Sequence, residues 1–156
     1  MRIAIGCDHA GFPMKATLVE EIKRAGHEVD DVGAPDARPS DYPDFARAVG
    51  ERVASLRADR GVVVCGSGVG ASVAANKVPR VRAALCHDTF SARQGVEDDD
   101  LNVLCLGARV IGPELAKEVL LAFLKSRFSQ AERHVRRLGK IKAIETDARE
   151  GLFDEP

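Results

Sequence analysis

The chain lacks any apolar run near the ~20 residues that a membrane-spanning helix needs. It also lacks a charge excess, because the formal net charge is −1, and this balance argues against general binding to nucleic acids or membrane surfaces. Residues 1–3 lead directly into an expected strand rather than into a signal peptide. These absences predict a cytoplasmic protein with no nucleic-acid partner and no membrane partner.

Cysteine is scarce, and its spacing excludes two kinds of site. The four cysteines, Cys7, Cys65, Cys86 and Cys105, form no CxxC pair, which is the spacing typical of zinc sites. All four fall in or at the ends of expected strands. The pattern predicts reduced, buried thiols and argues against a disulfide framework or a metal centre.

Short apolar runs alternate with amphipathic segments along most of the chain. A length of 156 residues suits one domain with a full core. Strands are expected at 2–7, 27–32, 62–65, 82–86 and 102–106, and helices near 13–25, 43–56, 71–76, after 88, 113–123 and 130–146. Five such alternations predict an α/β fold, in which helices cover both faces of a five-stranded parallel sheet. The domain is expected to span 1–146, and 147–156 to form a loose tail.

A glycine loop after the third strand carries the strongest chemical signal. The apolar run Val62–Cys65 ends at Gly66-Ser67-Gly68-Val69-Gly70, and a helix is expected to begin at Ala71. Unpaired N–H groups of such a loop and first helical turn form an anion site. Cys65 is placed at the carboxyl end of the strand, where open parallel sheets bind ligands. Since N–H dipoles activate a neighbouring thiol, Cys65 is a candidate base or nucleophile.

Two simpler interpretations of this loop remain open. A cysteine at a strand end is commonly a small buried apolar residue, and glycines also serve tight strand-to-helix turns. A dinucleotide site is less favoured, because it would use the first turn, Gly6–Gly11. Asp88 could accept a hydrogen bond from the ribose of a dinucleotide, but it follows the strand at 82–86, which is the wrong strand for that role.

Other polar residues are expected at the same edge of the sheet. Asp8 and His9 follow the first strand, His87 the fourth and Arg109 the fifth. Because the carboxyl ends of parallel strands share one edge, these side chains should lie near the glycine loop. They show no standard metal-ligand spacing.

The last helix carries a basic cluster. Arg133 and Arg137 are four residues apart and therefore lie on one side of a helix. Two guanidinium groups on one side suit a phosphate dianion, although a basic run is often only a solvated face. A helix so late in the chain could reach the site of a neighbouring subunit.

Five motifs together resemble a known family. They are GCDHAGFPMK at 6–15, DYPDFA at 41–46, VCGSGVGASVAANKVPRVRAAL at 64–85, NVLCLGARVIG at 102–112 and ERHVRRL at 132–138. From residue 1 to about 144 the chain is similar to the RpiB/LacA/LacB family of sugar-phosphate isomerases, most closely to its ribose-5-phosphate isomerases of type B. The resemblance implies a Rossmann-like three-layer αβα sandwich and a cofactor-free aldose–ketose isomerase. It also implies a homodimer or a dimer of dimers.

The resemblance assigns roles to individual residues. Cys65 would move a proton between C1 and C2 of ribose 5-phosphate or ribulose 5-phosphate, and Ser67 would help to hold the enediolate. The phosphate would be bound by Arg109, joined by Arg133 and Arg137 of the other subunit. The implied substrate-binding residues form a site shared between subunits: Asp8, His9, Tyr42, Gly66, Gly68, Val69, Gly70, Arg109, Arg133, His134 and Arg137.

One position departs from the family pattern. Ribose-type members carry His-Asn four residues before the Asn-Val of the fifth strand, where this chain has Asp98 and Asp99. The histidine is associated with opening the furanose ring and the asparagine with holding a sugar hydroxyl. Asp98 is therefore a candidate catalyst of ring opening, and Asp99 a candidate substrate ligand. Alternatives are a tetrose 4-phosphate or hexose 6-phosphate substrate, or a non-catalytic sugar-phosphate-binding module.

Overall fold

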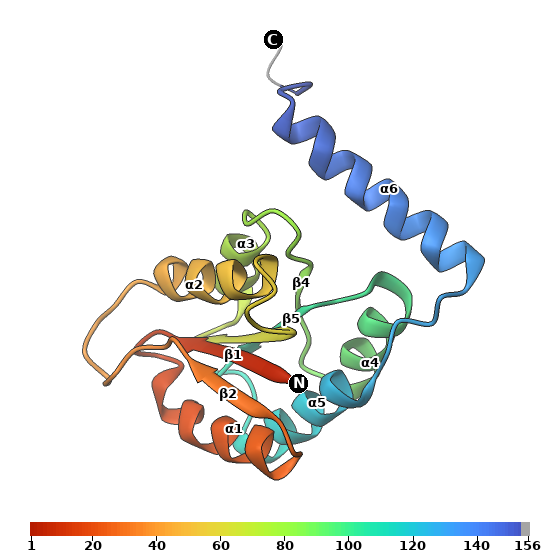
Figure 1. The fold of residues 1–156 in the computed structure, drawn as a ribbon. Coiled ribbons are helices and arrows are strands. Elements are labelled where there is room, and N and C mark those ends of the chain that lie inside the picture. Colours follow the sequence, from red (N-terminus) through yellow and green to blue (C-terminus); the bar gives the residue numbers. More distant parts are fainter. Residues whose placement is uncertain (154–156) are drawn as a thin grey trace.

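The computed structural model describes residues 1–153 and consists of one sheet between two layers of helices (Figure 1). The strands are all parallel. Their order in the sheet is β2-β1-β3-β5-β4. Their bounds are β1 (Arg2–Cys7), β2 (Glu28–Asp31), β3 (Arg60–Cys65), β4 (Ala83–Leu85) and β5 (Val103–Gly107). The predicted α/β fold with a five-stranded parallel sheet is confirmed, and β3 is its central strand.

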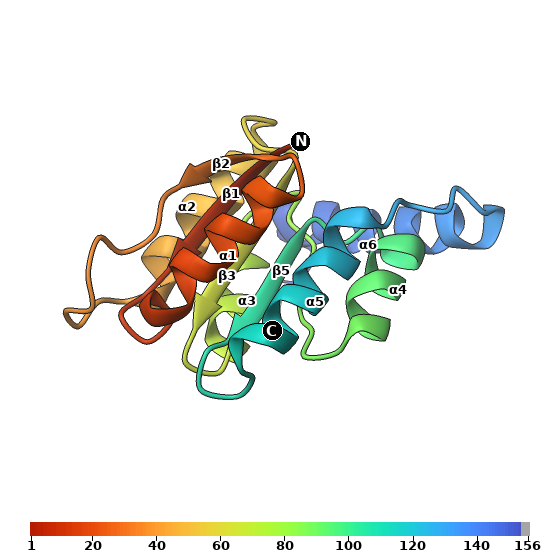
Figure 2. The same ribbon diagram turned by 90° about the horizontal axis from the view of Figure 1, so that it is seen from below.

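The core has two halves, one on each face of the sheet, because successive side chains of a strand point to opposite faces. Ile3, Ile5, Val62 and Val64 pack against α1 (Phe12–Arg24), α4 (Thr89–Asp99) and α5 (Pro113–Lys125). Ala4, Val63 and Cys65 pack against α2 (Tyr42–Ala54) and α3 (Val69–Ala75). Figures 1 and 2 show these two helical layers on either side of the sheet.

The last helix, α6 (Glu132–Arg149), projects away from the sheet (Figure 1). It ends three residues beyond the expected helix end at 146, so residues 147–149 of the predicted loose tail are helical. A turn follows through residue 153, and the remaining part of the predicted tail, 154–156, lies outside the described residues. Over the described chain, no helix combines the length and the apolar character needed to cross a bilayer.

Candidate active site

A cavity of about 350 Å³ opens where β1, β3 and β5 end. Eight residues that line it were predicted from the sequence, and Ala10 and Val110 complete the lining. Neither of these two apolar residues carries a chemical signal in the sequence. We call the eight predicted residues the cavity group: Asp8, His9, Tyr42, Cys65, Gly66, Ser67, Gly70 and Arg109. Within residues 1–153, no three His, Cys, Asp or Glu side chains gather so as to hold a metal ion.

The Cys65 thiol lies under the glycine loop. Its side chain is buried, and Sγ accepts the backbone N–H of Gly68 at 3.1 Å. The loop reaches back in this way because Gly68 has φ of +80°, in the left-handed region, where glycine carries no steric penalty. Val69 N donates to Ser67 Oγ at 3.2 Å. The loop thus directs the N–H of Gly68 toward the sulfur and holds the Ser67 hydroxyl through the N–H of Val69, while Gly68 and Val69 themselves stay outside the cavity lining.

The other three cysteines belong to the core, and none of the four forms a disulfide. Burial raises the pKa of Cys7 and of Cys105, and burial together with Asp88 raises the pKa of Cys86 to about 11. These thiols therefore stay protonated near neutral pH. Cys65 is the cysteine that lines the cavity.

Asp8 and His9 are each fixed by backbone contacts. Asp8 Oδ1 accepts the N–H groups of Ala10 at 3.0 Å and Gly11 at 2.9 Å, just before α1 begins. His9 N donates to Ser40 Oγ at 3.0 Å, and the backbone N of Ser40 lies 3.2 Å from His9 Nδ1. Because Ser40 occupies Nδ1, Nε2 is the ring nitrogen left for a substrate oxygen. Sequence reasoning missed Ser40, which lies in a loop far from His9 along the chain.

Tyr42 and Arg109 pack directly on the glycine loop. A Cβ at Gly70 would lie 2.5 Å from Tyr42 Cζ, so the tyrosine ring covers the start of α3 only because residue 70 is glycine. A Cβ at Gly66 would lie 3.4 Å from Arg109 Nη1. The guanidinium therefore lies beside the loop, where it can bind an anion.

His87 has a structural role at this edge. Its Nε2 accepts the backbone N–H of Gly107 at 2.9 Å, and Gly107 pairs with Cys65 in the sheet. The imidazole does not line the cavity. It holds the end of β5 in place beside the end of β3.

Five further predicted site residues lie on α4 and α6, and we call them the α4–α6 group: Asp98, Asp99, Arg133, His134 and Arg137. Asp98 Oδ1 lies 3.4 Å from Nε2 of His134, whose side chain is buried. Gln94 Nε2 donates to Asp98 Oδ2 at 2.6 Å, and Ser129 Oγ lies 2.7 Å from His134 Nδ1. Gln94 and Ser129 gave no signal in the sequence. Together these contacts anchor the first turns of α6 to the end of α4.

The two groups lie at opposite edges of the same sheet. A helix that connects parallel strands starts at their carboxyl edge and ends at their amino edge, so Asp98 and Asp99, which end α4, lie at the edge away from Cys65. Arg133 and Arg137 are exposed on α6, outside the cavity lining. Within one chain, the structure therefore does not bring the α4–α6 group to the cavity group.

Comparisons with known proteins agree with this architecture. The Ribose/Galactose Isomerase family profile matches residues 3–141. Ribose-5-phosphate isomerase B of Escherichia coli is 42% identical over 92% of this chain and 96% of its own length. D-erythrulose-4-phosphate isomerase of Pectobacterium atrosepticum is 40% identical over 82% of this chain and 85% of its own. The solved ribose-5-phosphate isomerase B of Clostridium thermocellum superposes with a TM-score of 0.92 at 44% identity, covering 95% of this chain and 99% of that one.

Proposed function

This chain belongs to the family of ribose/galactose isomerases, and on that basis we propose that it interconverts ribose 5-phosphate and ribulose 5-phosphate. The observation that carries the proposal is Cys65, a thiol at a strand end beneath the N–H groups of a glycine loop. Ser67 and Arg109 line the same cavity. The cavity thus combines a base, an oxyanion cradle and a cation for phosphate.

The proposed reaction needs only proton transfer. Cys65, as thiolate, removes the proton from C2 of the aldose, and the electrons of that bond form an enediolate as the C1 oxygen gains charge. Ser67 and the loop N–H groups hold the enediolate oxygens, where preorganised donors are most effective. Once the proton of the C2 hydroxyl has moved to the C1 oxygen, the Cys65 thiol returns its proton to C1, which yields the ketose with its carbonyl at C2. Arg109 and His9 hold the distant phosphate and sugar oxygens and fix the reacting carbons in place.

A tetrose 4-phosphate is the second candidate substrate. The relatives at 42% and 40% identity bear the names of a pentose and a tetrose phosphate isomerase, so identity does not separate the two. The observation that favours the tetrose is the Asp98-Asp99 pair in place of the ring-opening His-Asn. A phosphorylated O4 cannot close a furanose ring, and such a substrate needs no ring opening.

A substrate panel tests the proposal. We expect the purified protein to interconvert ribose 5-phosphate and ribulose 5-phosphate with a higher kcat/KM than D-erythrulose 4-phosphate or tagatose 6-phosphate, measured from both directions by NMR. A higher kcat/KM for the tetrose phosphate would show that the proposed substrate is wrong, while the proposed isomerisation would stand. If the protein binds sugar phosphates but converts none of them, it is a binding module, and the proposal is overturned.

The separation of the two residue groups leads us to propose a homodimer, alone or within a dimer of dimers, that shares its active sites. In a symmetric dimer, the α4–α6 group of one subunit can complete the cavity group of the other. Exposed apolar side chains on α6 support a partner at this helix: Val135, Ile141 and Ile144 are 47%, 41% and 59% exposed. Arg133 and Arg137 would then bind the phosphate in the partner's cavity. The four free cysteines support a reducing, cytoplasmic location.

Subunit mixing tests the shared site. Cys65→Ala and Arg137→Ala chains, each inactive alone, should together recover about a quarter of wild-type kcat, because half of the random dimers hold one intact site of two. The matched control mixes Cys65→Ala with Arg109→Ala. Both substituted residues line the same cavity. Each site of the mixed dimer therefore contains one of the two substitutions, and no activity should return. Equal recovery in both mixtures, or none in either despite subunit exchange shown by mass spectrometry, would contradict the shared site.

A further inference from the structure

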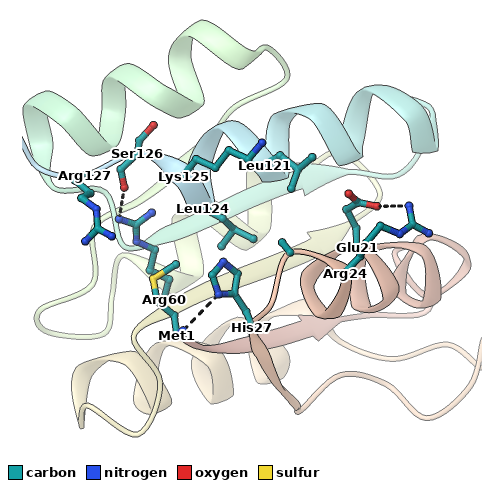
Figure 3. Close-up of a pocket in the computed structure, with 11 residues that line it drawn as sticks. Met1, Glu21, Arg24, His27, Arg60, Leu121, Leu124, Lys125, Ser126 and Arg127 are labelled. Atoms are coloured by element: carbon teal, nitrogen blue, oxygen red, sulfur yellow. Dashed lines mark hydrogen bonds and ion pairs between the residues drawn. The ribbon is translucent and has the colours of Figure 1, made fainter.

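A second and larger pocket lies at the amino edge of the sheet, away from Cys65 (Figure 3). Its volume is about 630 Å³, and it opens between the carboxyl ends of α1 and α5. Five cationic groups line it: Arg24, Arg60, Lys125, Arg127 and the amino group of Met1. Leu121 and Leu124 add an apolar wall. None of these residues has a role in the isomerase site.

Arg60 and Arg127 meet at one end of this pocket (Figure 3). Arg60 donates to the carbonyl oxygens of Phe123 and Ser126, the latter at 2.7 Å, at the end of α5. Burial first, and then the nearby charge of Arg127, lower the pKa of Arg60, whereas Asp100 and Asp59 act in the opposite direction. Within residues 1–153, no carboxylate forms an ion pair with either guanidinium. The guanidinium groups of Arg60 and Arg127 thus lie near each other without a carboxylate to neutralise them.

The charge of the whole pocket is positive. Glu21 pairs with Arg24 at 3.0 Å and neutralises it. The two helix ends each contribute about half a negative charge, which offsets one of the four remaining cations and leaves about three positive charges. His27 adds none near neutral pH, because burial and neighbouring positive groups lower its pKa. Capping of the helix ends therefore explains some of the cations but not all of them.

We propose that this pocket binds a nucleoside diphosphate or triphosphate. The excess of about three positive charges suits a diphosphate or triphosphate group, and guanidinium forks bind phosphate oxygens in pairs. The volume exceeds the 350 Å³ of the isomerase cavity, so the pocket has room for more than a pentose phosphate. Leu121, beside the edge of the buried Leu124, offers the apolar surface that a base or ribose face needs.

The pocket and the isomerase cavity are separate sites. Arg60 begins β3 and Cys65 ends it, so the strand runs from one site to the other. Nucleotide and sugar phosphate should therefore bind at the same time. A nucleotide that simply occupied the substrate cavity would instead be displaced by substrate.

Titration calorimetry with ADP, AMP and inorganic pyrophosphate, in low-salt buffer without metal ions, tests the site. ADP should bind at least tenfold more tightly than AMP, and saturating ribose 5-phosphate should leave its affinity unchanged. Arg127→Gln and Lys125→Gln, both at exposed positions, should together weaken ADP at least tenfold while isomerase activity stays at the wild-type level. Lys23→Gln is the matched control: it removes an exposed cation from the end of α1, outside the pocket lining, and should change the affinity less than twofold.

Four results would overturn the proposal. They are no heat of binding with millimolar ADP, equal weakening by Lys23→Gln, wild-type affinity in the double variant, and displacement of ADP by ribose 5-phosphate. Pyrophosphate that binds as tightly as ADP would overturn the nucleotide part, because the apolar wall would then contribute nothing.

Discussion

Replacement of Cys65 with alanine should lower kcat about 1,000-fold, within the range that a positioned general base contributes. The thiol lines the cavity and accepts the N–H of Gly68, so its loss removes the group that carries the proton. Arg109 and the glycine loop remain in the variant. Affinity for a phosphate-bearing inhibitor, measured by calorimetry, should therefore change less than threefold.

The matched control for this variant is Cys86→Ala. Cys86 is as buried as Cys65, each being 4% exposed, but it lies outside the cavity lining, and its raised pKa keeps it protonated. The control should cost stability through lost packing and leave kcat near the wild-type value. If Cys65→Ala keeps more than a few per cent of wild-type kcat, Cys65 is not the base and Asp8 becomes the candidate.

Most of the cavity group could be predicted because its residues end or follow a strand, whereas Tyr42, which begins α2, was assigned only by the family resemblance. Parallel topology brings every strand end to one edge, so Asp8, Cys65 and Arg109 needed only the right strand assignments to be placed together. No tertiary detail was required. The apolar runs that mark β1, β3 and β5 are the clearest in the chain, and all three strands were found.

The contacts of Asp98 and of Ser40 and the cationic pocket could not be predicted, because they depend on how distant segments of the chain pack together. Nothing in the sequence pairs Asp98 with His134, since that contact follows from the direction in which α6 leaves α5. The position of Ser40 beside His9 depends on a loop path in the same way. The cationic pocket combines side chains from α1, β3 and α5 with ordinary spacings, so it is visible only after the helices pack.

Asp98→Asn should separate ring opening from isomerisation. We expect kcat/KM for ribose 5-phosphate to fall about 100-fold, because amide nitrogen and oxygen cannot exchange a proton with the ring oxygen as a carboxyl group can. Turnover of D-erythrulose 4-phosphate, which has no furanose ring, should stay within threefold of wild type. Parallel assays on the two substrates measure the ratio.

The geometry around Asp98 sets the controls. An asparagine oxygen can still accept from His134, while the bond from Gln94 is lost, so the variant should lose no more than about 1–3 kcal/mol of stability. Gln94→Ala removes the same bond and keeps the carboxylate, and it should therefore keep the ribose 5-phosphate activity that Asp98→Asn loses. Melting temperatures of both variants show whether α6 stays anchored.

Subunit mixing completes the test of Asp98, because the residue lies at the sheet edge away from Cys65 of its own chain. A mixture of Asp98→Asn and Cys65→Ala chains should recover ribose 5-phosphate turnover, since one site of each mixed dimer would have both the thiol and the carboxylate. Equal loss on both substrates would instead show that Asp98 only anchors α6 through His134. Unchanged turnover on both would remove Asp98 from the reaction, and the ring would then have to open by another group or in solution.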